Sequence, residues 1–169
     1  MATGGTAGVF GQLNDPEYTN WIKATRALHV TMEALRTFCR DQMKDMHRLL
    51  LLTLGRTQCR GPCPGGNIVY DRNYNNYTIN CPDNVCSQWL TDIAAYRATR
   101  RTRLNTDNCD ISQWPVEPWQ VAKAFMNTGQ DRANVNPNGT DASGILNLLL
   151  NCSFFIPLVD KRHIEAVRV

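Results

Sequence analysis

Residues 15–55 read DPEYTNWIKATRALHVTMEALRTFCRDQMKDMHRLLLLTLG, and this stretch decides the class of fold. It opens with Asp15, Pro16 and Glu17, which suit a helix cap, the first helical position and the positive end of the helix dipole. Side chains that fit an apolar stripe then recur every three or four residues, at Tyr18, Trp21, Ile22, Thr25, Leu28, Met32, Leu35 and Phe38, and again at Met43, Met46, Leu49, Leu50 and Leu54. The spacing predicts one long helix, or two helices with a break near residues 39–41.

Leucine fills every position from 49 to 52, and an apolar run on all sides of a helix predicts deep burial of that end. Further helices are expected at residues 86–96, from Pro118 to before Gly129, after a cap at Thr140 or Asp141, and from about residue 160. Residues 67–70 and 77–80 lean towards strand and flank a polar turn, which predicts a hairpin. We therefore expect a mainly α-helical single domain over residues 15–169, with a flexible leader at 1–14 and an insertion at 56–86. Its last pattern is still running at residue 169, which predicts a domain truncated at its C-terminal end.

The composition is that of one folded domain: 169 residues, 43% hydrophobic and 20% charged, with a formal charge of +3. The mild positive charge permits an anionic partner without requiring one. No apolar run is long enough to cross a bilayer, and residues 1–8 lack the basic and apolar regions of a secretory signal. We expect an intracellular, cytoplasmic protein with no membrane partner.

The clustering of the cysteines points to a metal. A C-x3-C pair and a C-x4-C pair, each containing proline, bracket the predicted hairpin: Cys59, Cys63, Cys81 and Cys86. Two tight turns at the ends of a hairpin bring four thiolates together, as tetrahedral zinc requires. Because the insertion has few large apolar side chains, bound Zn2+ would supply the folding energy that burial cannot. The alternatives are unpaired buried thiols, or disulfides in a secreted protein.

The remaining ligand-type residues have other expected roles. Cys109 and His47 are reserve ligands, should one of the four cysteines not bind. Cys39 and Cys152 sit in apolar helical patterns and are expected in the core. The sequence lacks the motifs of catalytic zinc sites, so the predicted zinc is structural.

A basic cluster ends the helix expected at 86–96: Arg97, Arg100, Arg101 and Arg103. These guanidinium groups either form a solvated surface or bind the phosphates of RNA, with Tyr70, Tyr74, Tyr77 and Tyr96 as candidate stacking surfaces. The segment from Trp114 to Trp119 is expected to form a rigid corner that closes the core.

Catalysis finds little support in the residues. Arg40 and His47 would share one side of an unbroken helix, but such a pair is more typical of a polar edge than of a nuclease. No nucleophile motif or phosphate-binding glycine loop accompanies the three histidines. We expect a chain that is not an enzyme.

Asn108-Cys109, Trp114-Pro115-Val116, Trp119 and residues 121–126 resemble the central signature of an uncharacterised vertebrate family named for its open reading frame on the X chromosome. Residues 17–24, His47-Arg48, Cys86-Ser87-Gln88-Trp89 and residues 148–155 resemble its flanking blocks. That family is similar to the HEPN-like helical domains at the front of the DAZ-interacting zinc-finger ubiquitin ligase and of invertebrate proteins with suspected immune roles.

The resemblance implies a HEPN-like fold and a role in innate immunity. HEPN ribonucleases carry an Arg-x4–6-His motif, which the resemblance puts just after Arg168-Val169, so no residue of this chain inherits a catalytic role. The expected function is a non-enzymatic, zinc-stabilised recognition or assembly module that binds a protein partner or itself. Alternatives are an RNA-binding module that uses the arginine cluster and, more distantly, part of a HEPN ribonuclease whose active site lies beyond this chain.

Overall fold

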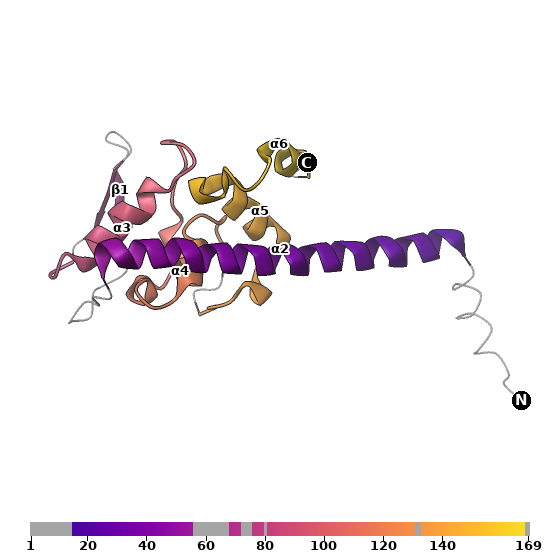
Figure 1. Ribbon diagram of the computed structural model, residues 1–169, viewed down its shortest axis with the longest axis horizontal. Helices are drawn as coiled ribbons and strands as arrows, with labels where there is room; N and C mark the ends of the chain where they lie inside the picture. The colour runs from indigo at the N-terminus through magenta and orange to yellow at the C-terminus, as the bar shows by residue number, and fades with distance from the viewer. Residues whose placement is uncertain (1–14, 56–67, 72–75, 80, 131–132, 168–169) are drawn as a thin grey trace, which may run out of the picture. The chain divides into compact units, whose positions relative to one another are not determined.

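The computed structural model describes residues 15–55, 68–71, 76–79, 81–130 and 133–167 (Figure 1). These residues form five α-helices and one two-stranded sheet, so the prediction of a mainly helical protein is confirmed. The chain divides into two compact units, residues 1–35 and residues 36–169, which are described separately below.

Helix α2 runs from Pro16 to Leu54 without interruption, so the sequence pattern reflects one helix rather than two. The Asp15 carboxylate accepts a hydrogen bond from the Glu17 amide at 2.9 Å, as expected of a helix cap. At the other end the Gly55 amide donates to the Leu51 carbonyl at 2.9 Å. Gly55 has a φ of 70°, a left-handed conformation that ends helices and favours glycine.

In the second unit, α2 contributes one buried stripe to the core: Cys39, Met43, Met46, His47 and Leu50. The prediction that residues 49–52 are buried on all sides is wrong. Leu49 is 47% exposed and Leu52 is 80% exposed, whereas Leu50 is only 3% exposed. Leu50 follows Met43 and Met46 at helical spacing, and its neighbours point away from that stripe because each residue turns a helix by about 100°.

The predicted hairpin is present. Strands β1 (Ile68–Asp71) and β2 (Asn76–Ile79) pair antiparallel, with Ile68 opposite Ile79 and Val69 opposite Thr78. Helix α3 (Val85–Ala95) begins shortly after β2 and contacts it. The Ser87 hydroxyl donates to the Ile79 carbonyl at 3.3 Å, which ties the first turn of α3 to the strand.

Three shorter helices complete the second unit: α4 (Pro118–Lys123), α5 (Ala142–Asn151) and α6 (Lys161–Val167). Helix α4 is shorter than predicted, and α5 begins at the expected cap, where the Asp141 carboxylate accepts from the Gly144 amide at 2.6 Å. Trp114 and Trp119 are both buried, so the predicted corner is confirmed. Among the described residues, no helix combines the length and apolarity needed to span a membrane.

Candidate functional site

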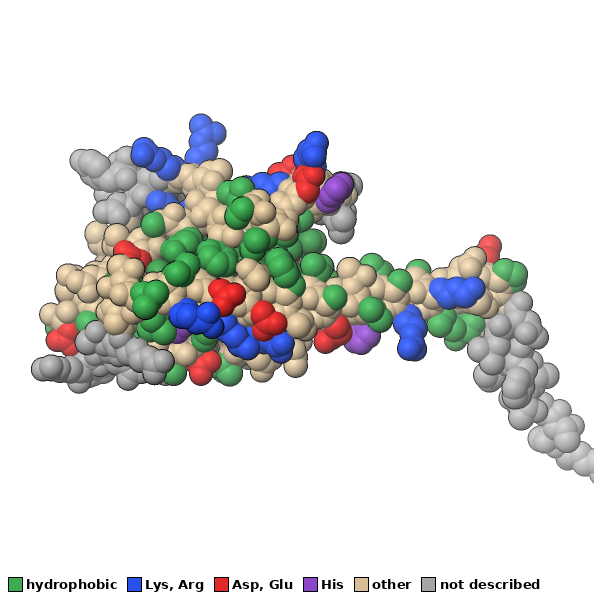
Figure 2. Space-filling model, viewed as in Figure 1, with side chains coloured by type: hydrophobic (Ala, Val, Ile, Leu, Met, Phe, Trp, Pro, Cys, Tyr) green, Lys and Arg blue, Asp and Glu red, His purple; other side chains and the backbone are tan. Residues whose placement is uncertain are grey.

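The first unit exposes an apolar face of α2. Of the twelve large hydrophobic side chains that are exposed in the described residues, five lie between residues 18 and 30. Trp21 is 63% exposed and Leu28 is 68% exposed, and the rings of Tyr18 and Trp21 stack with centroids 6.1 Å apart. Figure 2 shows hydrophobic side chains at the surface along this part of the helix. We call the set that follows the stripe spacing the α2 stripe: Tyr18, Trp21, Ile22, Thr25, Leu28, Met32 and Leu35.

The α2 stripe is uncharged at every position. The stripe is visible in the sequence, but the pattern alone does not mark it as a functional surface. The signal was present in the spacing of the stripe without Ile22, whose steps from residue 18 to residue 35 alternate between three and four as in helices that pack on other helices. Exposed apolar patches rimmed by polar residues mark sites of association, so this face is a candidate interface.

A groove in the second unit is lined by the end of α2 and by α3. It consists of two hollows of about 400 Å³ and about 360 Å³, which share Thr53 and Asp92. Leu49, Leu50 and Tyr96 line the first, and the second is lined by hydroxyl and amide side chains of α3 and its cap. Such a lining suits hydrogen bonding to a ligand, and among the described lining residues Asp92 is the one charged group.

The second cysteine pair flanks a tight turn. The Cys81 amide donates to the Ile79 carbonyl at 3.1 Å, and the Cys81 carbonyl accepts from the Asn84 amide at 3.0 Å. Cys86 lies in the first turn of α3 and is 5% exposed. The turn expected for this pair is therefore present. Cys59 and Cys63 lie outside the described residues, so the four-cysteine site stays a prediction.

Both reserve ligands take part in core contacts. The Nε2 atom of His47 lies 2.7 Å from the Trp114 carbonyl oxygen, and the His47 ring lies 5.7 Å from the Trp89 ring. A carbonyl only accepts, so Nε2 carries the proton and is not available to a metal. The buried Cys109 thiol donates to the Asn105 carbonyl at 3.8 Å. Among the residues that the structure describes, no three His, Cys, Asp or Glu side chains are grouped as a metal site would need.

The arginine cluster divides into one structural residue and three exposed ones. The Arg97 Nε atom donates to the Ala94 carbonyl at 2.9 Å, and its guanidinium lies over the Tyr77 ring, 5.6 Å from the centroid. Tyr77 is buried, and its hydroxyl is bonded to the Leu104 amide. The interpretation of Tyr77 as a stacking surface for RNA is therefore wrong, because its ring is part of the core.

The three remaining arginines of the cluster, Arg100, Arg101 and Arg103, follow α3 and are exposed. Tyr70 and Tyr74 lie where side chains are not described, and Tyr96 is partly exposed. Three of the four arginines of the cluster are therefore at the surface.

Two buried thiols are held in their neutral form. Cys39 and Cys152 are fully buried, and the Cys152 thiol donates to the Met46 sulfur at 3.7 Å. Burial raises the pKa of Cys39 to about 12, with a smaller contribution from Cys152, and burial likewise raises the pKa of Cys152 to about 12. Both residues are core residues, as the sequence predicts.

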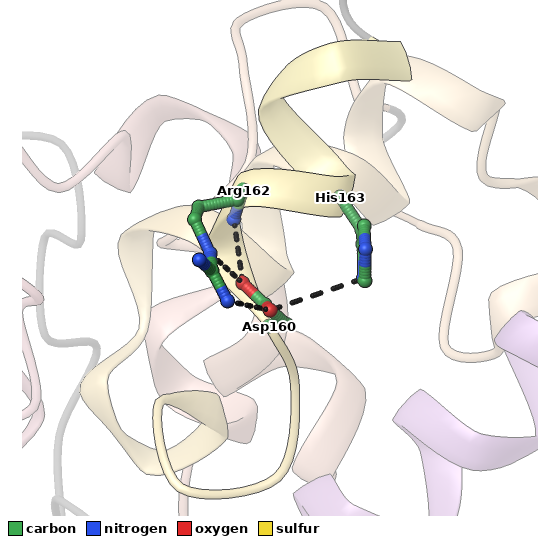
Figure 3. Close-up of polar contacts among 3 residues, drawn as sticks. All are labelled: Asp160, Arg162 and His163. Atoms are coloured by element: carbon green, nitrogen blue, oxygen red, sulfur yellow. Dashed lines mark hydrogen bonds and ion pairs between the residues drawn. The ribbon is translucent and has the colours of Figure 1, made fainter.

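Asp160, Arg162 and His163 gather at the start of α6 (Figure 3). The Asp160 carboxylate accepts from the Arg162 amide at 3.0 Å and from its Nη2 atom at 2.8 Å, whereas His163 Nδ1 lies 4.0 Å away. The hydrogen bonds from the Arg162 side chain and amide, with a smaller effect of His163, lower the pKa of Asp160. This cluster is a helix cap, because the carboxylate is occupied by its own helix.

Comparison with known proteins identifies the family. A domain of unknown function, DUF4559, matches residues 12–169, nearly the whole chain. The chain belongs to the DUF4559 family. An uncharacterised mouse protein, the CXorf38 homolog, is 31% identical over 157 residues, which are 92% of this chain and 47% of that protein. The DUF4559 chain thus spans about half the length of this relative, and the resemblance to an uncharacterised X-linked vertebrate family is confirmed. No solved structure matches this chain.

Most of the signature that carried the resemblance lies in the core of this DUF4559 chain, with Val116 exposed. The buried Asn108 amide donates to the carbonyls of Lys123 and Asn127, at 3.3 and 2.7 Å. Trp114 Nε1 donates to the Gln120 carbonyl at 3.3 Å. Each of these polar groups therefore has a partner inside the core, as buried polar groups require.

Proposed function

We propose that this chain is a non-enzymatic recognition or assembly module, and that the α2 stripe is its contact surface. The observation that supports this function is the change of exposure along one helix. From Cys39 onward the apolar face of α2 is core, whereas Trp21 and Leu28 on the same face are more than 60% exposed.

The energetic cost of that exposure supports the proposal. Apolar surface left in water forgoes about 25 cal/mol per Å², and a tryptophan can bury 150–250 Å². Helices gain most of their stability from packing an apolar face, so residues 16–35 would be stabilised by a partner that covers the stripe. The stripe carries no charged side chain and no His or Cys, which favours apolar packing on a partner.

The experiment measures assembly by light scattering over a range of protein concentrations. A double variant, Trp21→Glu with Leu28→Glu, introduces charge into the stripe. A matched control, Asn20→Glu with Ala27→Glu, adds the same charges at the same spacing on another face, where both residues are exposed. We expect a defined assembly for the wild-type and control chains and a monomer for the stripe variant. A wild-type monomer at every concentration would remove the proposal.

Zinc is the second part of the proposed function. We propose that Cys59, Cys63, Cys81 and Cys86 hold one structural Zn2+ that orders the insertion at 56–86. The turn from Cys81 to Asn84 supports the zinc proposal. It reverses the chain between Cys81 and the first turn of α3, where Cys86 lies, as the second cysteine pair of such a site requires.

Elemental analysis tests the zinc proposal. We expect about one zinc per chain in the wild type, and loss of that zinc in Cys59→Ser and in Cys86→Ser. Cys39→Ala is the control that keeps it, because Cys39 is fully buried in the core. A chain that contains no zinc and has the same melting temperature with and without a chelator would contradict the proposal.

The HEPN-like fold and a role in innate immunity are proposed on the resemblance of the signature blocks. The mainly helical fold is compatible with them. RNA binding is the second candidate function, favoured by the exposure of Arg100, Arg101 and Arg103. It predicts an RNA gel shift that weakens steeply with salt and is reduced in Arg100→Ala with Arg101→Ala. Binding that does not depend on salt would exclude it.

A further inference from the structure

The α2 stripe has the spacing of a coiled-coil seam. Its inner positions are Tyr18, Trp21, Thr25, Leu28, Met32 and Leu35, separated by steps of three, four, three, four and three residues. This is a heptad pattern with Tyr18, Thr25 and Met32 at one seam position and Trp21, Leu28 and Leu35 at the other. Helices with this pattern pack on another helix over the length of the seam.

We propose that the occupant of this seam is a second copy of the chain, paired antiparallel along residues 18–35. This inference rests on the proposed function and specifies its partner. In this antiparallel pair, residue i of one copy lies opposite residue 53 − i of the other. The six seam positions therefore form three types of layer. Tyr18 faces Leu35, Trp21 faces Met32, and Thr25 faces Leu28.

The side-chain volumes favour this arrangement over a parallel pair. A parallel pair would place Trp21 against Trp21 in one layer and Thr25 against Thr25 in another, so one layer would be crowded and another underfilled. The antiparallel pair sets each aromatic ring against an aliphatic or thioether side chain and sets Thr25 against Leu28. Layers of similar volume pack without voids or strain.

The charges allow two copies to approach. Besides the stripe, the segment Pro16 to Leu35 carries two acidic and two basic residues, Glu17, Glu33, Lys23 and Arg26. Its formal charge is therefore zero with His29 neutral, and no net repulsion opposes a pair. The antiparallel orientation also opposes the two helix dipoles, which is favourable at short distance.

The area is small for a specific dimer. Trp21 and Leu28 are 63% and 68% exposed, whereas Met32 and Leu35 are only partly exposed, so two copies would bury less than about 1,200 Å², the area of the smallest standard interfaces. We therefore expect a reversible dimer whose dissociation constant is of the order of micromolar.

The test uses thiol cross-linking between two single variants, Tyr18→Cys and Leu35→Cys. In the antiparallel pair residue 18 faces residue 35, whereas two copies of residue 18 lie about 25 Å apart along the axis. With a short bifunctional thiol reagent, we expect a covalent dimer when the two variants are mixed and none from either alone. Wild-type chain, with its seven native cysteines, sets the background.

The outcomes separate this inference from the proposed function. Cross-linking within each variant alone would indicate a parallel pair, which overturns the inference and leaves the α2 stripe as the contact surface. An assembly of defined mass without any stripe cross-link would indicate another surface, which overturns the inference and the assignment of the stripe but leaves assembly itself in place. A strict monomer in light scattering overturns both.

Discussion

His47 on α2 donates a hydrogen bond from Nε2 to the carbonyl oxygen of Trp114, at 2.7 Å. The two residues are 67 positions apart in the chain, and both are buried. This bond joins the long helix to the corner that closes the core of the second unit. His47 is therefore a structural hydrogen-bond donor. The sequence also suggested it as a reserve metal ligand and as one member of an Arg–His pair.

Removal of the imidazole should destabilise the second unit. His47→Ala leaves the buried Trp114 carbonyl without its donor, which costs about 1–3 kcal/mol of unfolding free energy. His47→Gln should retain much of the stability, because a glutamine amide can donate from nearly the same place. Urea unfolding measures both. His29→Ala, at an exposed position, is the control and should change the free energy by no more than about 0.5 kcal/mol. Equal stability of His47→Ala and wild type would contradict the assignment.

The two buried thiols predict a loss of stability at high pH. Cys39 and Cys152 have a pKa near 12 in the folded chain and an ordinary value of 9.0 when exposed. Above pH 9 the unfolded chain has released these protons and the folded chain has not, so unfolding becomes easier as pH rises from about 9 to about 12. Denaturation at a series of pH values should give a steeper decline for the wild type than for Cys39→Ala with Cys152→Ala.

Thiol labelling checks the same assignment independently. At pH 8 a maleimide should leave Cys39 and Cys152 unmodified in the folded chain and modify both in urea, since the thiolate is the reactive form and both residues are fully buried. Rapid labelling of either residue under native conditions would show that the core opens there.

The helices could be predicted because their signals are local. The cap at Asp141, the proline at the start of α4 and the stripe of α2 each act over a few residues, and each marks an element that the structure contains. The hairpin was predictable for the same reason. Burial was not predictable in this way, because it depends on which segments pack against a face. A run of four leucines does not indicate which of them lies in the core, and Leu52 lies outside it.

The candidate site was predictable in part. The stripe of α2 is visible in the sequence, but the exposure of Trp21 and Leu28 is a property of the folded chain that no local pattern encodes. Arg97 illustrates the same limit. Its sequence neighbours suggest a phosphate-binding cluster, whereas its contacts with Tyr77 and with the Ala94 carbonyl form only when distant segments pack together.

The left-handed residue before α3 predicts a specific response to substitution. Asn84 has a φ of 58°, and its side chain makes no capping hydrogen bond. Asn84→Gly should therefore keep or slightly raise the stability, because glycine adopts this conformation without strain. Asn84→Ala should lower the unfolding free energy by about 1 kcal/mol. Urea unfolding at constant zinc concentration compares the two, and a more stable alanine variant would show that the turn relaxes.

The cap of α6 predicts a carboxyl group that stays ionised in acid. Because Arg162 lowers the pKa of Asp160, the Asp160 carboxylate is protonated at a lower pH in the folded chain than in the unfolded chain. The cap therefore contributes its stability above the ordinary pKa of 3.8, and that contribution is lost as pH falls through the lowered value. An NMR titration of the Asp160 carboxyl carbon should give a midpoint below 3.8 in the wild type. Arg162→Ala should raise it, while Lys161→Ala, which removes the same charge one position earlier, should leave it nearly unchanged. Equal shifts in the two variants would mean that general charge, not the hydrogen bonds of Arg162, holds the carboxylate, and added salt would then raise the midpoint in all three chains alike.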